Sequence, residues 1–114
     1  MENMELVKFI YNTLDAKKAE DIKILQIDKI SSVADYFVIA GATSSTHLNS
    51  LADELEFKLK EAGVEPFHRD GLRSGNWVVL DYIGVMVHIF NKESRQYYGL
   101  EKMWAEGKEI TMNN

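Results

Sequence analysis

The stretch Asn76–Phe90 constrains the fold most strongly, because it has the composition of a β-hairpin. Two runs rich in β-branched and aromatic residues flank Ile83-Gly84, and a glycine at that point supplies the backbone freedom that a tight reversal needs. Strand side chains alternate between two faces. The first run therefore has a purely apolar face, formed by Val78, Leu80 and Tyr82. Its other face is mixed and is formed by Trp77, Val79 and Asp81.

The second run of the hairpin divides in the same way. One side is apolar and consists of Val85, Val87 and Ile89. The other side is mixed and consists of Met86, His88 and Phe90. A mixed face either packs under a helix or contacts a partner protein. Which of the two holds here decides what the protein does.

Hydrophobic periodicity places the other elements around the hairpin. In chain order we expect a helix over Met4–Lys18, strands over Asp21–Asp28 and Asp35–Gly41, a helix from an N-cap at Thr43 or Ser44 to Gly63, a strand over Glu65–Asp70, the hairpin, and a helix over Tyr97–Trp104 before a polar tail. This order predicts an α/β fold with a mixed sheet of about five strands flanked by helices, and the second helix as the crossover between parallel strands.

Length and composition narrow the class of protein. The 114 residues predict one domain over residues 1–114, and the absence of cysteine excludes a disulfide scaffold. No apolar run reaches the ~20 residues of a membrane span and no signal peptide is recognisable, so we expect a cytoplasmic protein without membrane contact. The formal net charge of −5 argues against electrostatic wrapping of nucleic acid and suits a basic protein partner.

Catalytic and metal-binding patterns are weak in this chain. A Gly-Ser turn before a helix, as in Gly41–Ser45, also occurs in nucleotidyltransferases, which place paired carboxylates after it for metal ions. The nearest acidic pair, Glu54 and Glu56, projects from opposite sides of a helix and cannot share an ion. The three histidines lack metal-ligand spacing, and we expect His88 to be a hydrogen-bonded sheet histidine. We therefore expect no metal and no cofactor, with a nucleotide-handling enzyme as the alternative.

Arginines and aromatic residues gather in the second half of the sequence. They are Arg69, Arg73 and Arg95 with Phe67, Trp77, Tyr97 and Tyr98. Acidic residues interrupt them, namely Asp70, Asp81, Glu93 and Glu101. A basic and aromatic surface for RNA would lack these carboxylates, whereas Trp, Tyr and Arg are typical anchors of protein interfaces. The pattern favours protein recognition.

Five sequence blocks, in this order and spacing, resemble the ribosomal silencing factor family, also called Iojap-like proteins. The blocks are Lys18–Ile22, Ala34–Ala40, Trp77 with Leu80-Asp81, Val87–Phe90, and Arg95–Trp104. The resemblance covers nearly the whole chain. It implies a non-enzymatic factor that binds the large ribosomal subunit through large-subunit ribosomal protein fourteen, blocks subunit joining and represses translation when nutrients are short.

The resemblance also implies a homodimer in the free state and a sheet related to the nucleotidyltransferase fold without its catalytic carboxylates. Little or no direct nucleic-acid binding is expected. Together with the mixed faces of the hairpin, the resemblance indicates a set of partner contacts. These are Trp77, Val79, Leu80, Asp81, Met86, His88, Arg95, Tyr97, Tyr98, Glu101 and Trp104.

Overall fold

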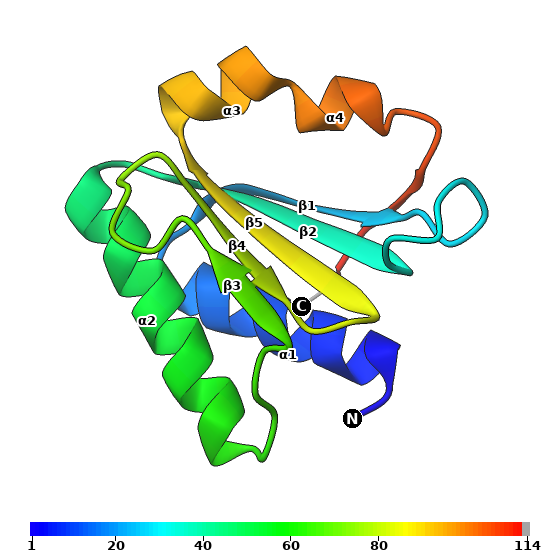
Figure 1. Cartoon of the computed structure of the whole chain (residues 1–114), viewed down its shortest axis with the longest axis horizontal. Helices are drawn as coiled ribbons and strands as arrows, with labels where there is room; N and C mark the ends of the chain where they lie inside the picture. Colours follow the sequence, from blue (N-terminus) through cyan, green and yellow to red (C-terminus); the bar gives the residue numbers. More distant parts are fainter. Residues whose placement is uncertain (113–114) are drawn as a thin grey trace.

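The computed structural model describes residues 1–112 and has three layers (Figure 1). Its elements are α1 (Asn3–Ala16), β1 (Glu20–Gln26), β2 (Tyr36–Ala42), α2 (Ser45–Glu61), β3 (His68–Asp70), β4 (Trp77–Asp81), β5 (Val85–Asn91), α3 (Lys92–Tyr98), α4 (Leu100–Met103) and β6 (Lys108–Ile110). The six strands form one sheet in the order β3-β4-β5-β2-β1-β6. Only β2 and β5 run parallel within it.

The predicted mixed sheet with flanking helices is confirmed, but it has six strands rather than about five. The additional strand, β6, lies in the segment that we expected to be a polar tail. It pairs antiparallel with β1, from Gln26↔Lys108 to Ile24↔Ile110. Backbone hydrogen bonds hold this edge strand, so its side chains need no strand-like pattern.

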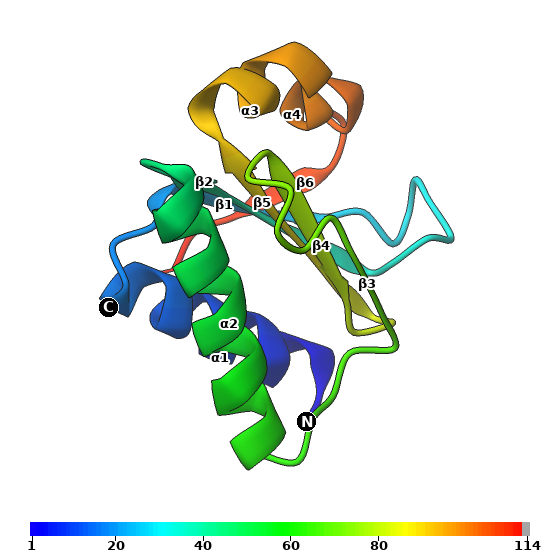
Figure 2. The ribbon, with the colours of Figure 1, turned by 60° about the vertical axis from the view of Figure 1, so that its left-hand side comes forward.

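The C-terminal helix also differs from the prediction. It begins at Lys92 rather than Tyr97, because the Asn91 side chain caps it by accepting a hydrogen bond from the Ser94 N–H at 2.8 Å. Gly99, in the left-handed region at φ 57°, then separates α3 from α4. The result is two short helices that cross the sheet opposite α1 and α2 (Figure 2).

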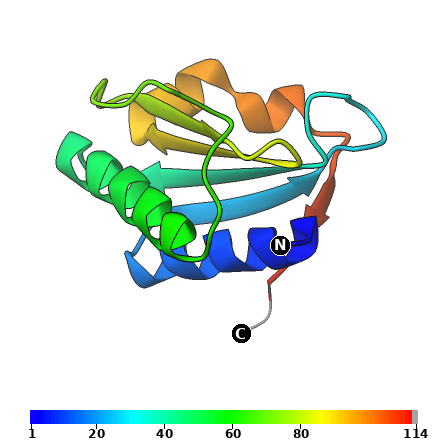
Figure 3. The same cartoon turned by 60° about the horizontal axis from the view of Figure 1, so that its bottom comes forward.

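The main core lies between the sheet and α1 with α2 (Figure 3). The apolar faces predicted for the hairpin strands point into it, and the main-core residues of β4 and β5 are Val78, Leu80, Val85, Val87 and Ile89. At the start of α2 the Ser44 Oγ accepts a hydrogen bond from the His47 N–H at 3.0 Å, which confirms the predicted N-cap. Four leucines of α2 are fully buried, so the amphipathic pattern determines which helix face meets the sheet.

A second, smaller core lies on the other side of the sheet, beneath α3 and α4. Its buried members are Leu25, Ile27, Ala34, Phe37, Ile39 and Phe90. Trp77, Met86, Leu100 and Trp104 pack against them and stay partly exposed. The mixed face of the hairpin is therefore covered by helices at one end and open at the other.

The hairpin turn has a different geometry from the one expected. The residue with positive φ is Ile83, at 71°, and not the adjacent glycine. A Cβ at position 84 would lie 2.4 Å from the end of the Asn3 side chain at the start of α1, so that side chain would have to move for a larger residue. The Gly84 carbonyl also accepts hydrogen bonds from the Asp35 and Tyr36 N–H groups at 2.9 and 3.0 Å, which fixes the turn against β2.

Candidate protein-interaction site

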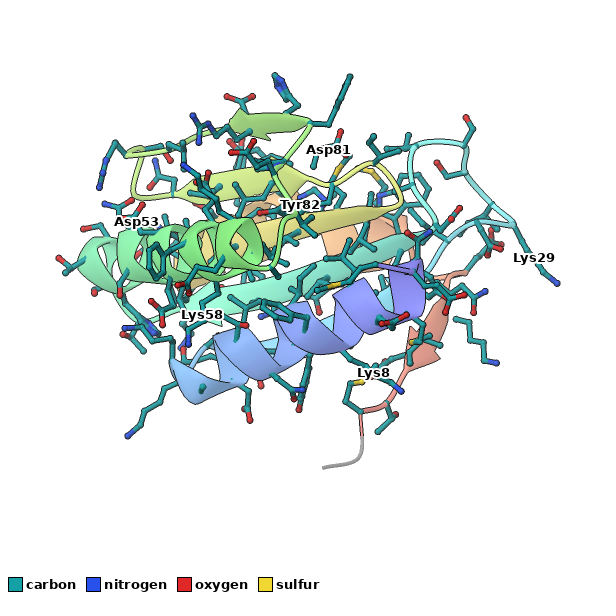
Figure 4. All side chains as sticks on the ribbon, turned by 90° about the horizontal axis from the view of Figure 1, so that it is seen from below. Lys8, Lys29, Asp53, Lys58, Asp81 and Tyr82 are labelled. Atoms are coloured by element: carbon teal, nitrogen blue, oxygen red, sulfur yellow. The ribbon has the colours of Figure 1, made fainter. Side chains whose placement is uncertain are left out.

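The sheet face opposite α1 and α2, together with α3, carries most of the predicted contact residues. We call it the aromatic face and define it by Trp77, Val79, Asp81, Met86, His88, Phe90, Tyr97 and Tyr98. The two tyrosines are the most open members, with Tyr97 84% and Tyr98 47% exposed. The opposite surface of the molecule differs in character, because α1 and α2 present charged side chains such as Lys8 and Lys58 there (Figure 4).

Trp77 is the centre of the aromatic face. Its ring stacks on Phe90 with centroids 4.9 Å apart and meets the ring of Tyr98 at 4.7 Å. Its indole Nε1 donates a hydrogen bond to Nδ1 of His88 at 3.2 Å. Because Tyr98 rests on Trp77, the exposed ring on α3 is held in place by a partly buried ring on β4. Trp77 thus contributes to the fold and to the surface at once.

His88 lies beneath this aromatic group and is 4% exposed. Burial lowers the pKa of His88 from its ordinary value of 6.5 to about 4, so the ring is neutral near pH 7. Since Nδ1 accepts from Trp77, the proton of the neutral ring is on Nε2, which has no hydrogen-bond partner among the described residues. The prediction of a hydrogen-bonded sheet histidine is confirmed, and burial leaves His88 no direct contact surface.

Asp81 lies at the open end of the aromatic face. It lies opposite Met86 in the β4–β5 register, and both side chains are half-buried. Its Oδ1 accepts a hydrogen bond from the Ile83 N–H at 2.8 Å, so the carboxylate holds the turn as well as facing solvent. Figure 4 labels Asp81 and the next residue, Tyr82, where β4 leads into the turn.

Arg95 and Glu101 form a strut that attaches α3 and α4 to the sheet. The Arg95 Nε donates to Glu101 Oε1 at 2.6 Å, and its guanidinium also donates to the carbonyls of Glu20 at 3.2 Å and Asp21 at 2.6 Å. Partial burial alone would raise the pKa of Glu101, but hydrogen bonds and charge from Arg95 and from Lys23 outweigh it and hold that pKa below its ordinary value. These two predicted contact residues therefore have an intramolecular role in the structure.

Two further predicted contact residues pack in the interior of the protein, one of them in part. Trp104 meets Phe37 edge to face at 5.3 Å and helps to close the second core, while staying partly exposed. Leu80 is wrong as a surface contact, because its side chain is fully buried in the main core under the helices. Strand parity already placed it on that face, opposite to Trp77.

The residues weighed for catalysis do not form a shared site. Glu56 accepts a hydrogen bond from Arg69 at 2.7 Å, whereas Glu54 lines a separate hollow with Asn49. His47 is engaged by the Thr43 N–H at 3.0 Å on one ring nitrogen and lies 2.9 Å from the Lys17 carbonyl on the other. Within residues 1–112 no group of three or more potential ligands is arranged to hold a metal ion. None of the helices in that range has the length and apolar character to cross a membrane.

Fold and site together define a class: a small three-layer α/β protein whose sheet presents an aromatic face that its helices only partly cover. The sequence profile described as ribosomal silencing factor during starvation matches residues 1–114. The chain belongs to this family, which is named for regulation and not for a reaction.

Relatives support the same assignment. A protein from Halalkalibacterium halodurans named ribosomal silencing factor RsfS is 36% identical over 112 residues, 98% of this chain and 96% of that protein. A crystal structure of a protein from Chromobacterium violaceum is 32% identical and superposes with a TM-score of 0.89, covering 100% of this chain and 94% of that one. A more distant relative from Mus musculus, named mitochondrial assembly of ribosomal large subunit protein 1, is 28% identical over 102 residues, 87% of this chain and 45% of that protein.

Proposed function

We propose that the protein silences ribosomes in the cytoplasm by binding the large subunit through large-subunit ribosomal protein fourteen. Bound there, it blocks joining of the small subunit and represses translation when nutrients are limiting. The observation that carries this proposal is the aromatic face, which the helices of the protein cover only in part. Because the chain belongs to a ribosomal silencing family, we infer that this exposed face is a surface for binding the ribosome. Its contact residues on our proposal are Trp77, Val79, Asp81, Met86, Tyr97 and Tyr98.

The physical character of this face supports a protein partner. Tryptophan and tyrosine dominate the energetics of protein interfaces because they bury a large area with few rotatable bonds. Tyr98 is already held against Trp77 at 4.7 Å, so little side-chain entropy is lost when it is covered. The net charge of −5 favours encounter with a basic ribosomal protein.

This function needs no catalytic group in the chain. Blocking subunit joining requires only that the factor occupy a surface that the small subunit would otherwise cover, so affinity and size determine the effect. The Arg95 strut contributes by fixing α3, which carries the exposed tyrosines, to the carbonyls of Glu20 and Asp21 at the start of β1. On this proposal Arg95, Glu101 and Trp104 support the contact surface from inside the protein.

We further propose that the free protein forms a homodimer that covers part of the aromatic face. Exposed apolar patches larger than a few hundred Å² rarely persist on a monomer, and self-association competes with the ribosome for the same residues. Sedimentation of the purified protein at micromolar concentration measures this directly. A monomer under those conditions would remove the dimer from the proposal.

The central experiment is a subunit-joining assay on sucrose gradients. Purified protein is added to isolated large and small subunits without added nucleotide, and we expect free subunits to increase at the expense of joined ribosomes. Tyr97→Ala should lose this activity, whereas Phe57→Ala is a matched control, because Phe57 is an aromatic residue 58% exposed on α2, in the opposite layer. The proposal would be refuted if both variants blocked subunit joining equally well. It would also be refuted if the wild-type protein left the amount of joined ribosomes unchanged. Nucleotide hydrolysis or transfer at about 1 per second or faster would instead support the enzyme alternative.

A further inference from the structure

Ile83 is the most strained residue of the hairpin and one of its most exposed. Its side chain is 66% exposed, and its φ is 71°. The Tyr82 carbonyl accepts a hydrogen bond from the Gly84 N–H at 3.0 Å, two residues further on. This bond and the positive φ of the residue between them are those of a γ-turn of the rare, strained form.

A β-branched side chain is among the least suited to this backbone conformation. Left-handed φ is uncommon for residues other than glycine, asparagine and aspartate, and it is an outlier for isoleucine. Four other positions with positive φ in the described chain are glycines, at 63, 71, 75 and 99, and the remaining three, Lys18, Asp21 and Arg73, are not branched at Cβ. The side chain of Ile83 is mostly in solvent, so packing within the fold does not account for an isoleucine here. Backbone strain that the fold does not need is a feature of residues that serve binding.

The position of Ile83 connects it to the aromatic face. The Asp81 side chain holds its N–H, and Asp81 is the last member of that face on β4. The Asp81 carbonyl accepts a hydrogen bond from the Phe67 N–H at 2.8 Å, which brings Phe67, 75% exposed, to the same end of the sheet. The γ-turn therefore places an exposed isoleucine next to Asp81, at the end of the sheet where the aromatic face is open.

We propose that Ile83 is an anchor residue of the interface, and that the γ-turn holds its side chain out to enter an apolar depression on the ribosomal protein. This inference rests on the proposed function, and it adds a contact that lies outside the β4, β5 and α3 residues. A protein surface is the partner that fits, because an aliphatic side chain has neither the charge that binds phosphate nor the ring that stacks on a base. The inference also predicts that a substitution that relieves the strain of the turn weakens binding and does not lower the stability of the fold.

The test compares Ile83→Asn, Ile83→Val and a matched control, Lys18→Asn. Asparagine tolerates positive φ, so Ile83→Asn should unfold at the same temperature as the wild type or higher, while its dissociation constant for isolated large-subunit ribosomal protein fourteen rises about tenfold or more. Ile83→Val keeps a branched apolar side chain and should bind within about threefold of the wild type. Lys18 is exposed, has φ 62° and lies just after α1, so Lys18→Asn relaxes a comparable strain and should leave binding unchanged.

Binding is measured by calorimetry at a temperature where circular dichroism shows every variant to be folded. Ile83→Asn that binds within about threefold of the wild type overturns the inference and leaves the proposed function standing. A loss of binding shared by Lys18→Asn also overturns it, because the effect would then come from relaxed turns in general. Failure of the wild-type protein to bind ribosomal protein fourteen refutes the proposed partner and this inference together.

Discussion

Replacing Trp77 by alanine should reduce both stability and binding, because this side chain belongs to the second core and to the aromatic face. An aromatic side chain of this kind buries at least ~150 Å², which at ~25 cal/mol/Å² gives roughly 4 kcal/mol as an upper estimate. The lost hydrogen bond to His88, measured at 3.2 Å in the structure, removes about 1 kcal/mol more. Trp77 is partly exposed and the site can relax, so we expect a net loss of about 3 kcal/mol, in the lower part of the range for core aromatic residues.

Thermal unfolding and co-sedimentation with large subunits measure the two effects separately. For a chain of this length about 3 kcal/mol corresponds to a Tm lower by roughly 10 °C, which leaves the variant folded at 20 °C. Binding at 20 °C should nevertheless fall by about 2 kcal/mol or more, because Tyr98 loses the ring that supports it at 4.7 Å. Trp77→Phe is the matched variant: it keeps a ring against Phe90 and Tyr98 and removes the indole donor, so it should recover most of the binding.

Two results would refute this reasoning. A Tm within about 2 °C of the wild type for Trp77→Ala would mean that the contacts with Phe90 and His88 contribute little to the fold. A large fall in Tm with unchanged binding at 20 °C would mean that Trp77 acts only in the core and that Tyr98 needs no support from it.

The remaining predictions test single residues. Leu80→Ala should destabilise the protein by ~2 to 5 kcal/mol by leaving a cavity in the main core, with binding retained where the variant is folded; loss of binding by folded protein would return Leu80 to the interface. Tyr97→Ala should change stability by less than ~0.5 kcal/mol, because the ring is 84% exposed, and a large drop in Tm would contradict that. His88 has a pKa lowered from 6.5 to about 4, so the unfolded chain takes up the proton first as pH falls, and about 3 kcal/mol of stability should be lost between pH 7 and pH 4. His88→Gln keeps an acceptor for the indole and should remove that loss; an unchanged pH dependence in urea titrations would point to other groups. Glu101 has a lowered pKa, so its contribution is present above the ordinary glutamate pKa and lost in acid; the Tm difference caused by Glu101→Gln should therefore shrink as the pH falls, and a constant difference would count against the strut.

Several parts of the fold follow from the sequence because they rest on short-range patterns. The period of two in the hairpin predicted which residues share a face, and the register pairs Trp77 with Phe90 and Val79 with His88 as that parity requires. The period of about 3.6 in α2 places its leucines on the one face that is buried, and the N-cap predicted at Thr43 or Ser44 is Ser44. Each of these features depends on residues a few positions apart, so the chain contains the information locally.

Other features depended on contacts between distant segments. The strand β6 has no pattern of its own and exists because β1 offers an unpaired edge. The role of Arg95 was missed as well, since its partners at Glu20 and Asp21 lie about 75 residues away in the sequence. No signal in the sequence indicated this contact, because the predicted helix began after Arg95 and a sequence does not show which segments lie side by side.

The sequence by itself determined the mixed α/β architecture, the two faces of the hairpin and the resemblance that family membership has confirmed. Tertiary structure decided which side chains remain on the surface. Parity placed Trp77, Asp81 and His88 on one face, but only the tertiary structure buries His88 among Phe37, Trp77 and Phe90, lays Tyr98 of α3 on Trp77 and leaves Asp81 half exposed. The same holds for the turn, where the residue with positive φ is Ile83 and not Gly84, and the N–H groups of Asp35 and Tyr36 donate hydrogen bonds to the Gly84 carbonyl. Periodicity is a property of neighbours along the chain, whereas exposure depends on everything packed against a residue, and for this protein exposure decides which residues are available to a partner.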